Sequence, residues 1–288
     1  MSEAGTLPTV PRDGKAAPPA ARAANPLARG RVRRVLGEWL PAVVVFVVVV
    51  ALWEFSLLAL NVQSFLIPRP SVIAGSLASE WDTLSKGLVY TGGEALGGLV
   101  IGVAIGTLAG MATARWVTAR ELLLPVAIGA STIPIIAFAP ITKNWFGYDN
   151  PVSRMSIVAL MVFFPVMVNT IRGLTNVDPA ALELMRSYAA GEGRVVRTLR
   201  VPNALPYWFT ALKIATTLSV IGAVVGEFFG GPLYSLGIYI TLETGHSRYP
   251  TAWAGIVIAC LLGIVLYLAV VVAEWIVMPW RLAREMNA

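Results

Sequence analysis

The residues of this chain best suited to chemistry are ionisable side chains inside, or at the ends of, strongly apolar runs. An ionisable group inside a membrane-spanning segment costs roughly a few kcal/mol, so each is a candidate for function. We expect Lys213 to reach water from the end of its run, and Glu274 to anchor the end of another. For Glu54 and Glu227, a structural hydrogen bond and contact with a solute both remain open. The full set is Glu54, Glu94, Lys213, Glu227 and Glu274.

Metal binding and cysteine chemistry have little support in the sequence. His246 is the only histidine, and Cys260, the only cysteine, lies in an apolar run. One histidine and one cysteine in different segments do not supply a zinc site, a disulfide framework or a clustered catalytic set. The sequence also lacks the Gly-x-x-x-x-Gly-Lys-[Ser/Thr] loop that binds nucleotide phosphates. We therefore predict a protein that is not an enzyme and uses no cofactor and no metal.

The composition indicates a membrane protein that crosses the bilayer several times. Of the 288 residues, 57% are hydrophobic and only 13% are charged, and the mean hydropathy is +0.72. Soluble domains are typically about a quarter charged. The net charge of +6 would suit a nucleic-acid partner, but the basic residues fall in short runs between apolar spans, which is a topology signal. We therefore predict an all-α polytopic membrane protein, with lipid around it and no nucleic acid as a partner.

Apolar runs long enough to cross a bilayer predict about six transmembrane helices in one domain, residues 37–288. Residues 1–36, rich in Pro, Ala and Arg, predict a disordered basic tail. After the first span, Ser71 is expected to cap an amphipathic helix at the outer membrane surface. The predicted spans are 39–60, 90–113, 122–141, 156–171, 207–229 and 252–278.

Small residues and prolines predict how two of these spans pack. The second span has glycines four residues apart, which let helix backbones approach closely. The third span contains Pro125, Pro134 and Pro140, and prolines free backbone carbonyls that need protein or water nearby. We therefore expect the third span in the interior of the bundle. The glycines of the predicted packing face are Gly98, Gly102, Gly106 and Gly110.

A polar stretch, residues 178–206, separates the fourth and fifth spans and is called the hairpin below. Asp178 followed by Pro179 is typical of a helix N-cap and first turn. We expect a first helix to Ala190, ended by Gly191 and Gly193, and a second helix, residues 194–200, that Pro202 stops. By composition alone, an ordinary cytoplasmic loop remains open.

The distribution of basic residues predicts the orientation of the chain. Cytoplasmic loops carry an excess of Lys and Arg. With six spans, most basic residues fall on the side that holds both termini and the hairpin. Few are expected on the other side: Arg69, Lys86, Lys143, Arg154 and Arg248. We therefore expect the N-terminus, the C-terminus and the hairpin to be cytoplasmic.

The hairpin resembles the EAA loop of permease subunits of bacterial ABC importers. In that family Glu-Ala-Ala is followed by Gly-Ala and, further on, by Leu-Pro. Glu183 takes the glutamate position, and residues 184–185 replace the two alanines. Ala189 and Ala190 take the Gly-Ala position, so that alanine replaces glycine, and Pro202 takes the final proline. The resemblance implies that the hairpin couples the chain to a separate ATPase. The residues expected to make this coupling are Glu183, Arg186, Ser187, Ala189, Ala190, Gly191, Arg194 and Pro202.

The resemblance extends over roughly residues 50 to 280. The matching blocks are Ile67–Ser71, Ile133–Gly147, Phe163–Val166, Ala211–Ala215 and Gly226–Phe228. They are similar to permeases for nitrate, sulfonates and taurine, and Glu94 is more typical of the subgroup associated with pyrimidine precursors of thiamin and with riboflavin. The resemblance implies the type I importer permease fold in a bacterial inner membrane.

The expected function is therefore a permease subunit that forms the translocation pathway for a small solute. The implied partners are an ABC ATPase dimer, a second permease copy (a homodimer) and an extracytoplasmic solute-binding protein. A stand-alone secondary transporter or channel is the alternative, since such proteins place acidic groups in their spans. The residues expected in the pathway are Glu94, Pro134, Pro140 and Glu227. The solute itself is not identified by the sequence.

Overall fold

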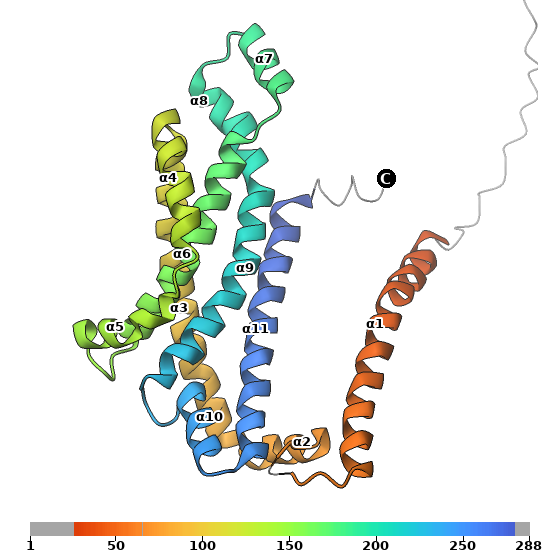
Figure 1. Cartoon of the computed structure of the whole chain (residues 1–288). Coiled ribbons are helices and arrows are strands. Elements are labelled where there is room, and N and C mark those ends of the chain that lie inside the picture. Colours follow the sequence, from red (N-terminus) through yellow and green to blue (C-terminus); the bar gives the residue numbers. More distant parts are fainter. Residues whose placement is uncertain (1–25, 65, 280–288) are drawn as a thin grey trace, which may run out of the picture. The chain divides into compact units, whose positions relative to one another are not determined.

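The computed structural model describes residues 26–64 and 66–279, with side chains from residue 40 onward (Figure 1). The chain divides into two units, residues 1–53 and 54–288. Helix α1 (Pro26–Ala59) begins in the first unit, and its segment Leu40–Ala59 is apolar enough to span a membrane. The predicted tail, residues 1–36, lies in large part outside the described residues. Its last part is helical instead, because Pro26 suits the first turn and good helix formers follow it.

The second unit consists of helices, and no strand occurs in residues 26–64 or 66–279. The predicted all-α polytopic fold is confirmed. In residues 26–64 and 66–279, which include the segment Leu40–Ala59 of α1, five helices are long and apolar enough to cross a membrane, or six if one bent pair counts as a single span. The helices are α2 (Pro70–Ser79), α3 (Trp81–Ala114), α4 (Val117–Ala130), η1 (Ile135–Phe138), α5 (Ala139–Phe146), α6 (Pro151–Thr175), α7 (Pro179–Ser187), α8 (Glu192–Val195), η2 (Val196–Arg200), α9 (Val201–Phe228), α10 (Leu236–Gly245) and α11 (Tyr249–Val277).

The centre of this unit is the contact of α3 with α6 and α9, and it confirms the predicted glycine face. A Cβ added at Gly102 would lie 2.6 Å from the carbonyl oxygen of Ala159, and one added at Gly98 would lie 2.4 Å from Cβ of Val158. Gly106 and Gly110 make equally close contacts with α6. Because only glycine leaves this space, the backbones of α3 and α6 approach closely along several turns.

The predicted third span, residues 122–141, is not one helix. The chain leaves the helix after α4, and the next pair, η1 and α5, is bent by 80° relative to α4. Pro134 lacks an N–H and disfavours helical geometry at the residue before it. Pro140 lies in the first turn of α5, where its missing N–H costs nothing. Only Pro125 lies inside a helix, α4.

The second half of the hairpin also differs from the prediction. The chain from Glu192 to Phe228 is one continuous apolar helix built from α8, η2 and α9, and Pro202 does not stop it. The segment before the proline, η2, is a π-helical turn. Its wider winding accommodates the proline ring, which would clash with a carbonyl of a regular α-turn. Helices α3, α6 and α11 are also longer than the spans predicted for them.

Helix α2 is capped differently from the prediction. Its N-cap is Arg69 and Pro70 opens it, so Ser71 lies in the first turn. Glu54, at the end of α1, accepts a hydrogen bond from Ser71 N at 3.0 Å and another from Ser71 Oγ at 2.7 Å. A carboxylate at a helix N-terminus satisfies free N–H groups and the helix dipole. The sequence left two roles open for Glu54, a structural hydrogen bond and contact with a solute. The structure shows the hydrogen bond.

Candidate functional site

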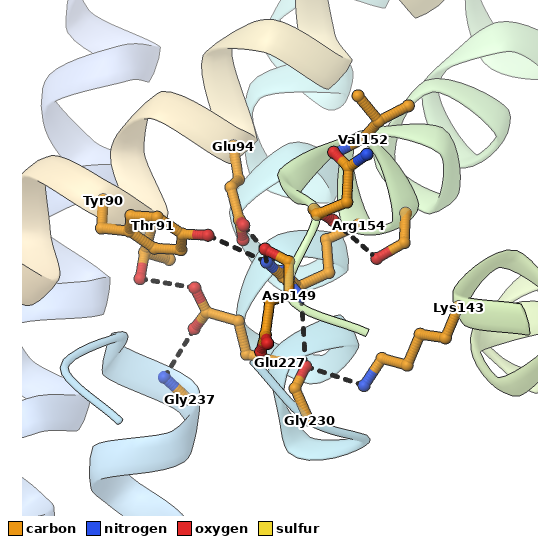
Figure 2. Close-up of polar contacts among 12 residues, drawn as sticks. Tyr90, Thr91, Glu94, Lys143, Asp149, Val152, Arg154, Glu227, Gly230 and Gly237 are labelled. Atoms are coloured by element: carbon orange, nitrogen blue, oxygen red, sulfur yellow. Dashed lines mark hydrogen bonds and ion pairs between the residues drawn. The ribbon is translucent and has the colours of Figure 1, made fainter. Parts of the chain in front are cut away.

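Five polar or charged side chains from four helices, α3, α5, α6 and α9, gather in one place (Figure 2), at the end of the second unit that is opposite the hairpin (Figure 1). We call them the buried polar cluster: Thr91, Glu94, Lys143, Arg154 and Glu227. Each has less than a tenth of its surface exposed. Charged side chains are rarely buried so completely unless they are paired. The sequence placed only two of them, Glu94 and Glu227, in one predicted site.

Arg154, in the first turn of α6, is the centre of the cluster and is fully buried. Its Nε donates to Oε1 of Glu94 on α3 at 2.6 Å, which forms a buried ion pair. Its Nη1 donates to the carbonyl oxygens of Tyr148 and Gly230, and its Nη2 to Tyr90 Oη and, at 3.5 Å, to the Asp149 carbonyl oxygen. A guanidinium has five N–H donors, so this one is fully satisfied.

Glu227, near the end of α9, holds the start of α10. It accepts a hydrogen bond from Thr91 Oγ1 at 2.7 Å and from the backbone N–H of Gly237 at 2.6 Å. Thr91 Oγ1 in turn accepts from Leu236 N at 3.0 Å. The first backbone N–H groups of a helix need such acceptors, and a carboxylate there also suits the dipole. The structure therefore gives Glu227 a structural hydrogen-bonding role.

Lys143, on α5, completes the cluster. Its Nζ donates to the carbonyl oxygen of Gly230 at 2.7 Å and lies 4.9 Å from the ring centre of Tyr148. The Gly230 carbonyl thus accepts from both Lys143 and Arg154. Gly230 has φ +124°, a backbone conformation that other residues rarely adopt. The cluster therefore ties together α3, α5, α6, α9 and α10, which are distant in sequence.

The sequence interpretation missed Arg154 and Lys143, which it counted among the basic residues of outer loops. Arg154 lies inside α6, which begins at Pro151, before the predicted span. Asn150 caps this helix by accepting from Val152 N at 3.0 Å. The Asn-Pro pair before Arg154 is a helix-start signal, so it would have placed Arg154 in the first turn. No local pattern indicates its burial.

The four residues predicted for the pathway do not form one site. Glu94 and Glu227 belong to the buried polar cluster. Pro134 lies at the break between α4 and η1 and lines a separate cavity of about 390 Å³. Pro140 is exposed at the start of α5 and does not line that cavity.

Lys213 and Glu274 are paired with each other. Lys213 Nζ on α9 and Glu274 Oε2 on α11 form an ion pair, with the Lys213 side chain 27% exposed and that of Glu274 8%. Lys213 is thus partly exposed, as expected, and its partner Glu274 was not foreseen. The two charges neutralise each other and connect two spanning helices.

The hairpin, in contrast, places its charges on the surface. The predicted N-cap is confirmed, since Asp178 accepts from Ala180 N at 2.9 Å. Helix α7 ends at Ser187, earlier than predicted. Among the residues expected to couple to an ATPase, Ala190 is half-buried and the others are exposed. No ion pair joins Glu183 to Arg186 in the described part of the chain.

The turn after α7 has a specific backbone geometry. Ala189 has φ +48°. Its N–H donates to the carbonyl of Arg186, and the N–H of Ala190 donates to the carbonyl of Met185. These two bonds form a Schellman motif, in which glycine is the usual residue at the left-handed position. The glycine of the EAA pattern falls at this residue. The left-handed backbone explains why glycine suits this position.

The hairpin also exposes large apolar side chains. Leu184 is 56% exposed and Tyr188 74%, and both lie on or just after α7. Val196 and Val201 follow on the continuous helix, at 39% and 41%. Figure 1 shows the hairpin at one end of the second unit, beyond the ends of α6 and α4. The hairpin therefore presents apolar side chains beside charged ones on a projecting element.

Comparison with known proteins gives one family. Residues 102–277 match the family model described as the inner membrane component of binding-protein-dependent transport systems. The formylaminopyrimidine transport permease protein of Halalkalibacterium halodurans is 33% identical over 241 residues, which cover 82% of this chain and 94% of that protein. The riboflavin transport system permease protein of Chloroflexus aurantiacus is 28% identical over 254 residues, 85% of this chain and 92% of that protein.

A third relative is associated with a different kind of solute. The putative aliphatic sulfonates transport permease protein of Bacillus subtilis is 27% identical over 256 residues, which cover 86% of this chain and 90% of that protein. The three relatives therefore match over nearly the same part of the chain.

Proposed function

The chain belongs to the family of binding-protein-dependent transport system inner membrane components, and we propose that it couples a solute pathway to a separate ATPase through the hairpin. Members of this family are transport permeases, so the chain is a multi-pass inner membrane protein and not itself an enzyme. The proposal concerns what the family name leaves open: the ATPase contact, the orientation and the pathway.

The observation that carries the proposal is the continuity of the hairpin with the bundle. The segment from Glu192 to Arg200, most of which is exposed, and the buried core of α9 belong to one helix, Glu192–Phe228. A rigid helix transmits a displacement at one end to the other, whereas a flexible loop would absorb it. Movement of an ATPase against the hairpin would therefore shift α9 directly. Helix α6 ends just before Asp178, so it would transmit the same displacement into the bundle from the other side of the hairpin.

The exposed side chains of the hairpin suit a docking contact. Leu184 and Tyr188 offer apolar area, while Glu183 and Arg186 offer opposite charges on the same helix face. Such a mixture of apolar anchors and charged neighbours is typical of protein interfaces. The proposed coupling residues remain those of the EAA resemblance, including Arg194 and Pro202 on the continuous helix.

The proposed orientation places the hairpin and both termini in the cytoplasm. It follows from the excess of basic residues on that side. Cysteine labelling tests it, because Cys260 is the only native cysteine. In a Cys260→Ala background, Ser187→Cys should react with a membrane-impermeant thiol reagent in inside-out vesicles and not in intact cells. Labelling in intact cells would reverse the orientation.

The proposed assembly contains two copies of this chain, two ATPase subunits and an extracytoplasmic solute-binding protein. The decisive experiment is purification of the tagged chain from its native host. An untagged ATPase should co-purify, and ATP hydrolysis by the complex should rise when the loaded solute-binding protein is added. Purification without any ATPase, together with uptake driven by an ion gradient, would instead support a stand-alone secondary transporter.

The solute class is a separate part of the proposal. By their names, relatives transport formylaminopyrimidine, riboflavin or aliphatic sulfonates. These solutes differ in charge, since the first two are uncharged heteroaromatic molecules and sulfonates are anions. A site in the pathway of this chain should therefore distinguish between them by its charge and its hydrogen-bonding groups.

A further inference from the structure

A cavity of about 390 Å³ lies between the break that follows α4 and the helices α6 and α9. Its volume falls within the range of about 300–1,000 Å³ that is usual for small-molecule sites. No Lys, Arg, His, Asp or Glu is among the residues that line it. Six of the lining residues are Ser131, Pro134, Ile136, Met161, Pro165 and Leu218.

At the break between α4 and η1, the backbone N–H groups are already hydrogen-bonded, whereas some backbone carbonyl oxygens have no donor. The N–H groups of residues 131–133 all donate back into α4, to the carbonyls of residues 127, 129 and 130. Pro134 has no N–H. In the described structure, the carbonyl oxygens of Ser131 and Ile133 accept no hydrogen bond, and both residues line the cavity.

Helix α6 adds to the same wall a backbone carbonyl that lacks its regular helical donor. Pro165 lies inside α6 and has no N–H, so it cannot donate to the carbonyl of Met161 one turn earlier. Both residues line the cavity. At membrane depth, carbonyl oxygens without a protein donor are tolerated where they line a water-filled cavity. The wall is therefore apolar, with carbonyl acceptors and no free backbone donor from the break.

Three basic residues of α5, α6 and α9 have partners outside the cavity. Arg154 directs its five donors to Glu94, Tyr90 and three backbone carbonyls, and Lys143 donates to Gly230. Lys213 is paired with Glu274. An anion in this cavity would meet carbonyl oxygens and apolar side chains, and neither compensates the loss of its hydration. An uncharged solute with N–H groups would instead donate to the free carbonyls.

We propose that this cavity is a solute-contact site that takes an uncharged, flat solute bearing N–H donors, such as an aminopyrimidine or a flavin, and excludes anions. This inference rests on the proposed permease function and deepens it by naming the solute class. It distinguishes among the kinds of solute that the relatives transport. The apolar side chains of Ile136, Met161 and Leu218 would contact the faces of the ring, and the carbonyls its edge.

The test is cysteine labelling of the full chain in membrane vesicles, in the Cys260→Ala background. Ser131→Cys places a thiol in the cavity wall, and Ser187→Cys, on the exposed hairpin, is the matched control. Each is treated with a neutral thiol reagent and with a sulfonate-bearing one of similar size. We expect the ratio of neutral to anionic rates to be at least about tenfold higher at residue 131, which corresponds to about 1.4 kcal/mol.

Protection by solutes gives the second readout. A neutral aminopyrimidine and riboflavin should slow labelling at residue 131 and leave residue 187 unchanged, whereas taurine and nitrate should slow neither. Ile133→Cys, also in the wall and exposed, replaces Ser131→Cys if that variant fails to accumulate. Protection by taurine or nitrate, or equal rates for both reagents at residue 131, would overturn the proposed solute class.

The two proposals fail in different ways. If an ATPase co-purifies with the chain and anions protect residue 131, the solute class is wrong and the coupling proposal stands. If no ATPase co-purifies, the coupling proposal fails whatever protects residue 131.

Discussion

The buried polar cluster and the hairpin both contain charged residues, but the two regions use charge in opposite ways. In the cluster, Arg154 and Glu94 are buried and form an ion pair, and Arg154 also donates to backbone carbonyl groups. In the hairpin, Glu183 and Arg186 are exposed and no ion pair joins them. The cluster and the hairpin lie near opposite ends of α6. At a rise of 1.5 Å per residue, this helix separates the two regions by roughly 35 Å.

One end of the bundle is therefore held together by buried contacts, whereas the other end exposes its charged groups to solvent. Buried charges without solvent must satisfy one another, so removing one is costly. Exposed charges contribute little to folding and remain available to a partner. We therefore expect mutations in the cluster to affect stability first, and mutations in the hairpin to affect coupling first.

The largest expected effect is that of Arg154→Ala. This variant removes five hydrogen bonds and leaves Glu94 buried without its cation. Breaking a buried ion pair in this way costs about 3–5 kcal/mol. Tryptophan fluorescence during thermal unfolding of the solubilised protein, and its level in the membrane, give the measurement.

The matched control for this variant is Arg186→Ala on the hairpin, where a surface substitution should change stability by less than about 0.5 kcal/mol. Equal destabilisation by the two arginine substitutions would contradict the contrast between the regions.

The next largest effect is expected for Glu227→Gln. The amide has one acceptor oxygen where the carboxylate has two, so one of the bonds from Thr91 and Gly237 is lost, at about 1–3 kcal/mol. Hydrogen exchange of the amides in α10 should accelerate, because this residue holds its N-terminus. Glu183→Gln is the control and should leave stability unchanged. Unaltered exchange in α10, combined with lost transport, would assign Glu227 to solute contact instead.

The fold was largely predictable because apolar length and charge distribution are properties of short segments. All the spans except the third, together with the Asp178 cap and the glycine face of α3, follow from such local patterns. The cluster was not predictable in this way. Arg154 is 60 residues from Glu94, and Glu227 is 136 residues from Thr91. Nothing near Arg154 in the sequence shows which distant carboxylate will neutralise it.

The errors about prolines have a related cause. Proline removes the same N–H everywhere, but the structural consequence depends on the neighbouring backbone. At Pro134 the chain bends sharply, at Pro140 a helix begins, and at Pro202 a π-helical turn lets the helix continue. A proline therefore predicts a local adjustment of the backbone, and tertiary packing selects which one.

A smaller effect of opposite sign is expected for Ala189→Gly. Ala189 has a left-handed backbone, which costs a residue with a Cβ roughly 1–2 kcal/mol relative to glycine. Because glycine also loses more backbone entropy on folding, we expect a net local stabilisation of about 1 kcal/mol. Hydrogen exchange of the amides in residues 178–190 measures it. Ala190→Gly, at a position without positive φ, should not stabilise the turn, and an equal gain from both would contradict this geometry.

The smallest effect on stability, with the largest on coupling, is expected for Glu183→Lys. Glu183 is exposed and unpaired with Arg186, so the substitution only adds like charges three residues apart, at a few tenths of a kcal/mol. Folding and membrane level should be nearly normal.

A docking contact is different, because it is made in every transport cycle and the reversed charge opposes the surface that Glu183 would meet. We therefore expect Glu183→Lys to abolish the stimulation of ATP hydrolysis by the loaded solute-binding protein, at matched subunit content. Glu183→Gln should retain part of that stimulation, since it removes the charge without reversing it. Full stimulation in Glu183→Lys would show that the hairpin couples through its apolar side chains, Leu184 and Tyr188, and that its charges are only solvated.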